Sequence, residues 1–229
     1  MNTQSYRPQG WQLFGLIAAL VVAMSIAAVA AQPDLVEGLR SAIRATARSS
    51  FALFLIAFTA SAFAVLVPSP LSKALVRERR FIGLAFAFSH LIHAVLIYGY
   101  GQLNTEFWPA RTVANNIPGG TAYAFILLMA MTSFKAPARL LGPKAWKTLH
   151  VTGMWVIAAV FAFSNFKRIP MSDWYVLPFG LTCAAVAIRL VGKLAMAKIA
   201  PVGGFITMAQ PLMACHLSIA AFIFCSTTY

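Results

Sequence analysis

Seven long apolar stretches constrain what this chain can fold into more than any other feature. A helix needs about 20 mostly apolar residues to cross the hydrocarbon core of a bilayer, because the core is about 30 Å thick and each residue advances about 1.5 Å. The stretches that reach or approach this length are residues 13–31, 51–67, 81–100, 117–134, 149–166, 174–192 and 202–226. The sequence therefore predicts an all-α integral membrane protein.

The composition supports this class and excludes others. Hydrophobic residues make up 60% of the 229 residues and charged residues 10%, whereas a soluble domain has about 45–50% and about 25%. Three cysteines without a CxxC pair are too few for a disulfide scaffold. The net charge of +13 comes largely from basic residues between the apolar stretches. That pattern suits an anionic lipid bilayer and not nucleic acid.

The basic residues are shared unevenly between the two sides of the predicted spans. With seven spans, twelve Lys and Arg fall on the side of the N-terminus and six on the other. Cytoplasmic loops carry the excess of Lys and Arg, so we expect a cytoplasmic N-terminus and an outer C-terminus. Arg7 and an apolar run ending in Ala28-Val29-Ala30 also resemble a cleavable signal peptide. Because the run is long for one, we expect a retained helix.

Residues 32–50, between the first two spans, have an amphipathic pattern. Three apolar residues recur there at helical spacing and three arginines lie beside them. Two interpretations are open, a short helix on the outer membrane surface and a solvated loop. The six residues are Leu35, Leu39, Ile43, Arg40, Arg44 and Arg48.

All four histidines lie in predicted spans, where an ionisable side chain is costly and suggests a function. His90 and His93 are three residues apart in the third span, His150 is near the start of the fifth, and His216 is deep in the seventh. Imidazole is a common iron ligand, and two imidazoles from facing helices can hold a b-type heme. The alternative is that each histidine only hydrogen-bonds a neighbouring helix. Zinc is not expected, because no carboxylate and no HExxH pattern accompanies them.

Two motifs carry a resemblance to a known family. Arg79-Arg80-Phe81-Ile82-Gly83-Leu84, with His93 ten residues after the glycine, resembles the third-helix motif of the ferric reductase-like transmembrane superfamily. Trp146-Lys147-Thr148-Leu149-His150 resembles the fifth-helix motif of its sulfoxide reductase heme-binding subunit branch. The resemblance covers residues 13–193, and the seventh span lies outside it.

This resemblance implies a bundle of six helices over residues 1–193 that carries heme b and passes electrons across the membrane. Residues 194–229 would add a further span. The implied location is the inner membrane of a bacterium, and the implied partner is a membrane or peripheral redox subunit, with quinol as another electron source. Arg79, Arg80 and Lys147 would lie near heme propionates, or would serve only as positive-inside charges.

The sequence departs from the family in the fifth helix. The family has a second histidine further along that helix, where this chain reads Ala162-Phe163-Ser164-Asn165. His93 is about nine residues deeper in its span than His150, or about 14 Å along parallel helices. We therefore do not expect His93 and His150 to clamp one heme. We expect His93 to be the indispensable ligand, with His90, His216 or no protein group opposite it.

Two functions follow from these patterns. The first is a membrane heme protein that passes electrons from quinol or a partner flavoprotein to an acceptor on the outer side. The second is a heme-free structural or assembly subunit of a larger membrane complex, which the missing histidine and the added span favour. A transporter is a weaker interpretation, because no acidic residue lies in a span to couple ions.

Overall fold

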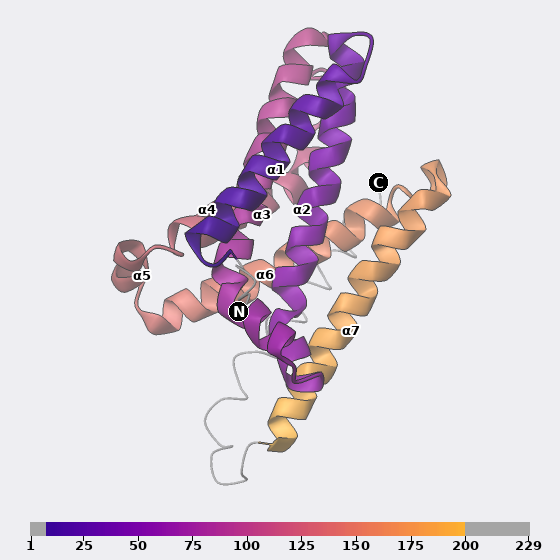
Figure 1. Ribbon diagram of the computed structural model, residues 1–229. Helices are drawn as coiled ribbons and strands as arrows, with labels where there is room; N and C mark the ends of the chain where they lie inside the picture. The colour runs from indigo at the N-terminus through magenta and orange to yellow at the C-terminus, as the bar shows by residue number, and fades with distance from the viewer. Residues whose placement is uncertain (1–7, 200–229) are drawn as a thin grey trace, which may run out of the picture. The chain divides into compact units, whose positions relative to one another are not determined.

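The computed structural model describes residues 8–199, which are almost entirely helical (Figure 1). The helices are α1 (Trp11–Ala30), α2 (Leu35–Leu66), α3 (Pro70–Leu103), α4 (Val113–Met131), α5 (Lys135–Leu141), α6 (Pro143–Phe166) and α7 (Val176–Ile199). Short 3-10 turns at Ile169–Met171 and Asp173–Tyr175 precede α7. The described residues contain no strand, which confirms the all-α prediction. The chain divides into two compact units after Gly192, and the fold and sites below lie in the first.

The helices account for six of the seven predicted spans. Five described helices are long and apolar enough to cross a membrane, and a sixth span results if α4 and α5, which meet at 107°, form one broken span. The seventh predicted span, residues 202–226, lies outside the described residues. Large apolar side chains on the outside of the helices are more than half exposed, as lipid-facing surfaces require. They include Leu20, Ile26, Leu91, Val95 and Leu127.

The amphipathic segment 32–50 is neither a separate surface helix nor a loop. It forms the first half of α2, which runs unbroken for 32 residues. The Asp34 side chain caps this helix by accepting a hydrogen bond from the Glu37 N–H at 2.9 Å. Thr46 and Ser50 are fully buried, so one face of the segment packs against protein and not against lipid headgroups.

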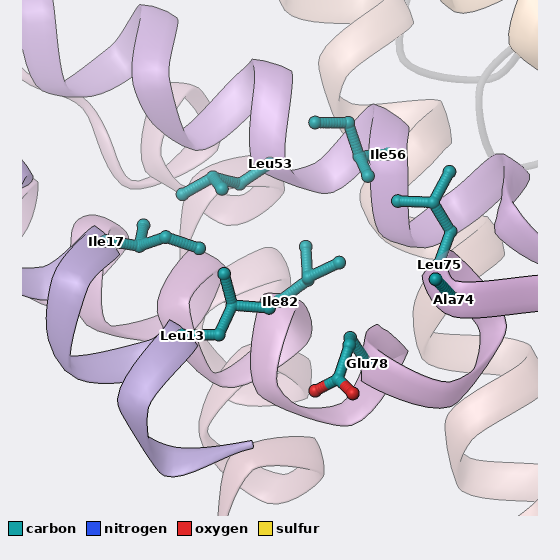
Figure 2. Close-up of a pocket in the computed structure, with 8 residues that line it drawn as sticks. All are labelled: Leu13, Ile17, Leu53, Ile56, Ala74, Leu75, Glu78 and Ile82. Carbon is teal, nitrogen blue, oxygen red and sulfur yellow. The ribbon is translucent and has the colours of Figure 1, made fainter. Parts of the chain in front are cut away.

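A buried carboxylate ties the start of α1 to α3. Glu78 is 8% exposed, and its two oxygens accept hydrogen bonds from the Gly10 N–H at 2.7 Å and from Arg77 Nε at 2.9 Å. Glu78 also borders an apolar pocket of about 210 Å³ among α1, α2 and α3, whose other labelled side chains are aliphatic (Figure 2). Because both oxygens are satisfied, Glu78 serves as a structural anchor.

Aromatic rings fill the centre of the bundle. Phe54 of α2 lies 5.3 Å from Phe58, 5.6 Å from Phe86 of α3 and 5.2 Å from Phe161 of α6, measured between ring centroids. Pairs at these separations gain about 0.5–1.5 kcal/mol beyond their burial. The cluster joins helices that are distant in sequence and so fixes the interior of the bundle.

Gly83 and Gly153 lie on the histidine faces of the third and fifth predicted helices, so the sequence predicts that these glycines let the two helices pack side by side. The structure shows that the glycines do not serve this purpose. A Cβ on Gly153 would clash with Met129 Sδ and lie 3.1 Å from Phe125, both on α4. Gly153 therefore lets α6 approach α4. A Cβ on Gly83 would meet no described atom within 4 Å, so Gly83 faces open space. The main backbone partner of α3 is α2.

We expect Gly192→Ala to destabilise the protein, because α7 meets α2 there without room for a methyl group. The added Cβ would lie 2.7 Å from Ala62 Cβ and 2.9 Å from Ala62 Cα. Overpacking of this kind costs about 1–3 kcal/mol. Unfolding in detergent followed by circular dichroism measures the change. Gly180→Ala is the matched control, because the same helix leaves its Cβ in open space; equal stability of the two variants would contradict the prediction.

Candidate functional site

A cavity of about 650 Å³ opens among α2, α3, α4, α5, α6 and α7. Its walls include Phe54, Phe86, Met129 and Met154, and its volume lies within the roughly 300–1,000 Å³ that is typical of ligand and cofactor sites. Six basic side chains line it, and among the described residues no Asp or Glu does. The six are Arg77, Arg79, Arg80, Lys135, Lys147 and Arg189. This space, which we call the basic cavity, suits a ligand with an apolar body and anionic groups.

His150 lines the basic cavity and is held on two sides. Its Nε2 lies 3.0 Å from Thr132 Oγ1, and the Trp146 ring stacks on it with centroids 4.2 Å apart. Trp146 Nε1 in turn donates to the Thr132 carbonyl at 2.8 Å. Trp146 and His150 are four residues apart and share one face of α6. The first turns of α6 and the end of α4 therefore fix the imidazole together.

Two arginines place positive charge inside the cavity. Arg189 donates to the Phe58 carbonyl at 2.5 Å, and its guanidinium lies 4.4 Å from the Phe58 ring centroid. Arg79 donates to Ser61 Oγ at 2.6 Å. The salt bridges found in the described part of the chain involve neither arginine. Arg189 is partly buried, whereas Arg79 is exposed. A partly buried charge without a counter-ion is costly, so an anionic ligand is expected to be stabilised beside Arg189.

His90 and His93 lie further along α3 and do not line the basic cavity. Their rings are 5.5 Å apart. The His90 ring also contacts Tyr123 of α4 at 4.9 Å, and its buried Nδ1 has no hydrogen-bond partner among the described residues. His93 Nδ1 lies 3.0 Å from Thr46 Oγ1 on α2.

The structure brings two of the four predicted histidines together and separates the third. His90 and His93 are neighbours on one helix and cannot grip a ligand from opposite sides. His150 stands apart from both, because it lines the basic cavity and they do not. The Phe86 ring borders both places, since it contacts His90 and also lines the cavity. His216 lies outside the described residues. Where the family motif has a second fifth-helix histidine, Asn165 donates to the Phe161 carbonyl at 2.8 Å.

Some residues of this site carry a signal in the sequence, and others carry none. Arg79, Arg80 and Lys147 were expected either near an anionic cofactor or as loop charges, and all three line the cavity. Arg189 was noticeable as the one charged residue in a predicted span, but its position beside α2 had no sequence signal. The contacts of Thr46 and Thr132 with histidines had none either, because threonine is common in membrane helices.

Comparison with known proteins places this geometry in a family. Residues 44–161 match the family described as ferric reductase like transmembrane component. Over 128 residues the chain is 32% identical to the protein-methionine-sulfoxide reductase heme-binding subunit MsrQ of Azospira oryzae. The matched region covers 48% of this chain and 52% of that protein. The chain thus spans about half the length of that relative. No solved structure matches it. Since the family match covers just over half of the 229 residues, the chain belongs to the ferric reductase-like transmembrane family.

Proposed function

We propose that this protein is a membrane heme-binding subunit that transfers electrons, and that its basic cavity holds a b-type heme. The observation that carries the proposal is the cavity itself, in which one imidazole and six basic side chains meet, with no carboxylate from the described residues 8–199. The relative in Azospira oryzae is named as a heme-binding subunit, which supports the same function.

The residues of the basic cavity fit this group. His150 offers an imidazole, the usual protein ligand of b-type heme iron. Gly83 leaves space beside the α3 backbone, and Phe54, Phe86 and Met154 supply apolar walls. The basic side chains are opposite in charge to the two propionates of a heme. A bound heme would supply one-electron redox chemistry.

The residues of the cavity have separable roles in this proposal. His150 would be the axial ligand, and the Trp146 ring stacked on it would limit its rotation. Arg79 and Arg189 would neutralise propionates and favour electron uptake through their positive charge. The aromatic core beside the cavity would exclude water from the interior.

His93 is the proposed ligand of a second position, further along α3. A single position near one end of the bundle would leave the rest of the membrane uncrossed, and His93 lies further along α3 than the residues of that helix that line the basic cavity. The unpaired Nδ1 of His90 beside it marks a buried polar site that a ligand would satisfy. The basic cavity carries the proposal, because His150 lines it and His93 does not.

The proposed electron path runs from quinol or a partner flavoprotein to an acceptor on the outer side. The chain shows no nucleotide-binding motif of its own, so a partner or quinol would supply electrons. A redox partner subunit is further supported by the name of the relative, which is one subunit of a protein-methionine-sulfoxide reductase. The proposed location is the inner membrane of a bacterium.

Purification from heme-supplemented cells tests the function directly. We expect a Soret band, and a sharp α band after reduction with dithionite. A colourless preparation of folded protein would overturn the proposal and support the alternative, a heme-free structural or assembly subunit.

The orientation proposed for the protein has the basic cavity at the cytoplasmic end. Arg77, Arg79 and Arg80 lie in the first third of α3, Lys135 begins α5 and Lys147 lies in the first turns of α6. All five line one cavity. Both basic segments therefore lie at the same end, where the positive-inside bias predicts the cytoplasm. We expect alkaline phosphatase fused after Gly142 to be inactive and green fluorescent protein fused there to be fluorescent. The opposite pair of results would place this end outside.

A further inference from the structure

Thr46 and His93 form a buried side-chain contact between α2 and α3. Thr46 is 0% exposed, and its Oγ1 lies 3.0 Å from His93 Nδ1. Ser49 and Ser50 on the next turn of α2 both bond Ser89 of α3, at 3.0 and 2.9 Å. These bonds keep the two helices in register, so Thr46 is held opposite His93 by more than its own contact.

The proton of the Thr46 hydroxyl determines which group donates. Oγ1 donates to the Ala42 carbonyl at 2.8 Å, with the Ile43 carbonyl at 3.1 Å. A hydroxyl has one proton, so Oγ1 is left as an acceptor toward His93. This contact therefore calls for an N–H on the imidazole, and the nitrogen beside Thr46 is Nδ1.

We propose that Thr46 is a positioning residue that holds neutral His93 with its proton on Nδ1 and a lone pair on Nε2. The hydrogen bond made by one ring nitrogen determines which nitrogen can bind a metal. The tautomer is inferred from the hydrogen bonds of Thr46, whereas the use of Nε2 as a heme ligand rests on the proposed function.

His150 shows the reverse arrangement. Thr132 Oγ1 donates its one proton to the Leu128 carbonyl at 2.7 Å. By the same reasoning, the proton of His150 lies on Nε2, the nitrogen beside Thr132. The bare nitrogen of His150 is then Nδ1. His93 can bind a metal through Nε2 and retain its hydrogen bond to Thr46. His150 must bind through Nδ1, or else give up its hydrogen bond to Thr132. The two threonines therefore act in opposite directions on the two histidines.

Nitrogen-15 NMR of histidine-labelled, heme-free full-length protein in detergent tests the tautomers at pH 8, where an ordinary imidazole with a pKa of about 6.5 is neutral. Loss of a signal in His93→Gln and in His150→Gln assigns the two rings. We expect wild-type His93 to be protonated on Nδ1 and wild-type His150 on Nε2. A wild-type His93 protonated on Nε2 overturns the proposal. If the variants do not fold, a wild-type spectrum in which no histidine is protonated on Nδ1 overturns it as well.

Substitutions then separate positioning from packing. Thr46→Val is expected to move the His93 proton toward Nε2, and Thr46→Ser to keep it on Nδ1. Thr59→Val is the matched control, because Thr59 is a buried threonine of the same helix that donates to the Leu55 carbonyl at 2.7 Å, with no histidine contact described. An unchanged His93 tautomer in folded Thr46→Val, or an equal change in Thr59→Val, contradicts a positioning role for Thr46.

Heme retention gives a second readout for the same variants. Loss of a hydrogen bond to a metal-binding histidine costs about 10–100-fold in affinity, so Thr46→Val should release heme from the His93 position with that weakening. Thr132→Val should not weaken the retention of a heme that His150 binds through Nε2. The substitution removes the Thr132 hydroxyl, which otherwise competes with iron for that nitrogen. If the wild-type protein binds no heme, the proposed function fails, and the NMR result still decides the tautomer.

Discussion

His150→Ala and His93→Ala should each remove the heme that the substituted histidine holds, and the double variant should be colourless. An axial imidazole supplies the iron–protein bond, and its loss leaves only apolar and charge contacts. The heme-to-protein ratio of purified protein measures the effect. Sequence analysis ranks His93 as the indispensable ligand, whereas the structure places the open volume at His150. A ratio that is unchanged in either variant removes that histidine from the proposal.

Val151→Ala is the control for the first prediction. Val151 follows His150 directly and also lines the basic cavity, so the substitution enlarges the cavity without removing a ligand. We expect its Soret band to equal that of the wild type. Equal heme loss in Val151→Ala and His150→Ala would show that packing and not ligation is responsible.

Replacing both Arg79 and Arg189 with methionine should weaken heme retention by about 10-fold or more and lower the midpoint potential. Charge-assisted hydrogen bonds to a carboxylate contribute about 1.5–3 kcal/mol each, and about 1.4 kcal/mol corresponds to tenfold in affinity. The potential falls because nearby cations favour the reduced, less positive iron. Heme transfer to apomyoglobin and a redox titration measure the two effects.

Arg139→Met provides the matched control for the arginine pair. Arg139 belongs to the same basic end of the protein and is exposed, as Arg79 is, but it does not line the basic cavity. A general loss of positive charge would change both variants alike. Normal retention and potential in the Arg79 and Arg189 double variant would exclude the basic cavity as the site of the propionates.

Hydropathy determined most of the helices correctly, because the cost of burying a polar backbone in lipid depends on local composition. The segment 32–50 shows the limit of this reasoning. Its arginines and apolar residues suggested a surface helix or a loop, but its other face carries Ala42, Thr46 and Ser50, which are fully buried. Small and hydroxyl-bearing residues on one face indicate contact with another helix.

The sequence by itself determined the membrane class, six of the helical segments and the basic clusters at one end, because each depends on residues close together in the chain. Only the tertiary structure decided which groups share a site. Arg189 and Phe58 are in contact although 131 positions separate them, and Gly153 packs on α4 where α3 was expected. Helix neighbours in a bilayer are selected by interhelical packing and hydrogen bonds, and hydropathy carries no information on either. The same contacts determine which nitrogen of each histidine is bare, the property on which metal binding depends.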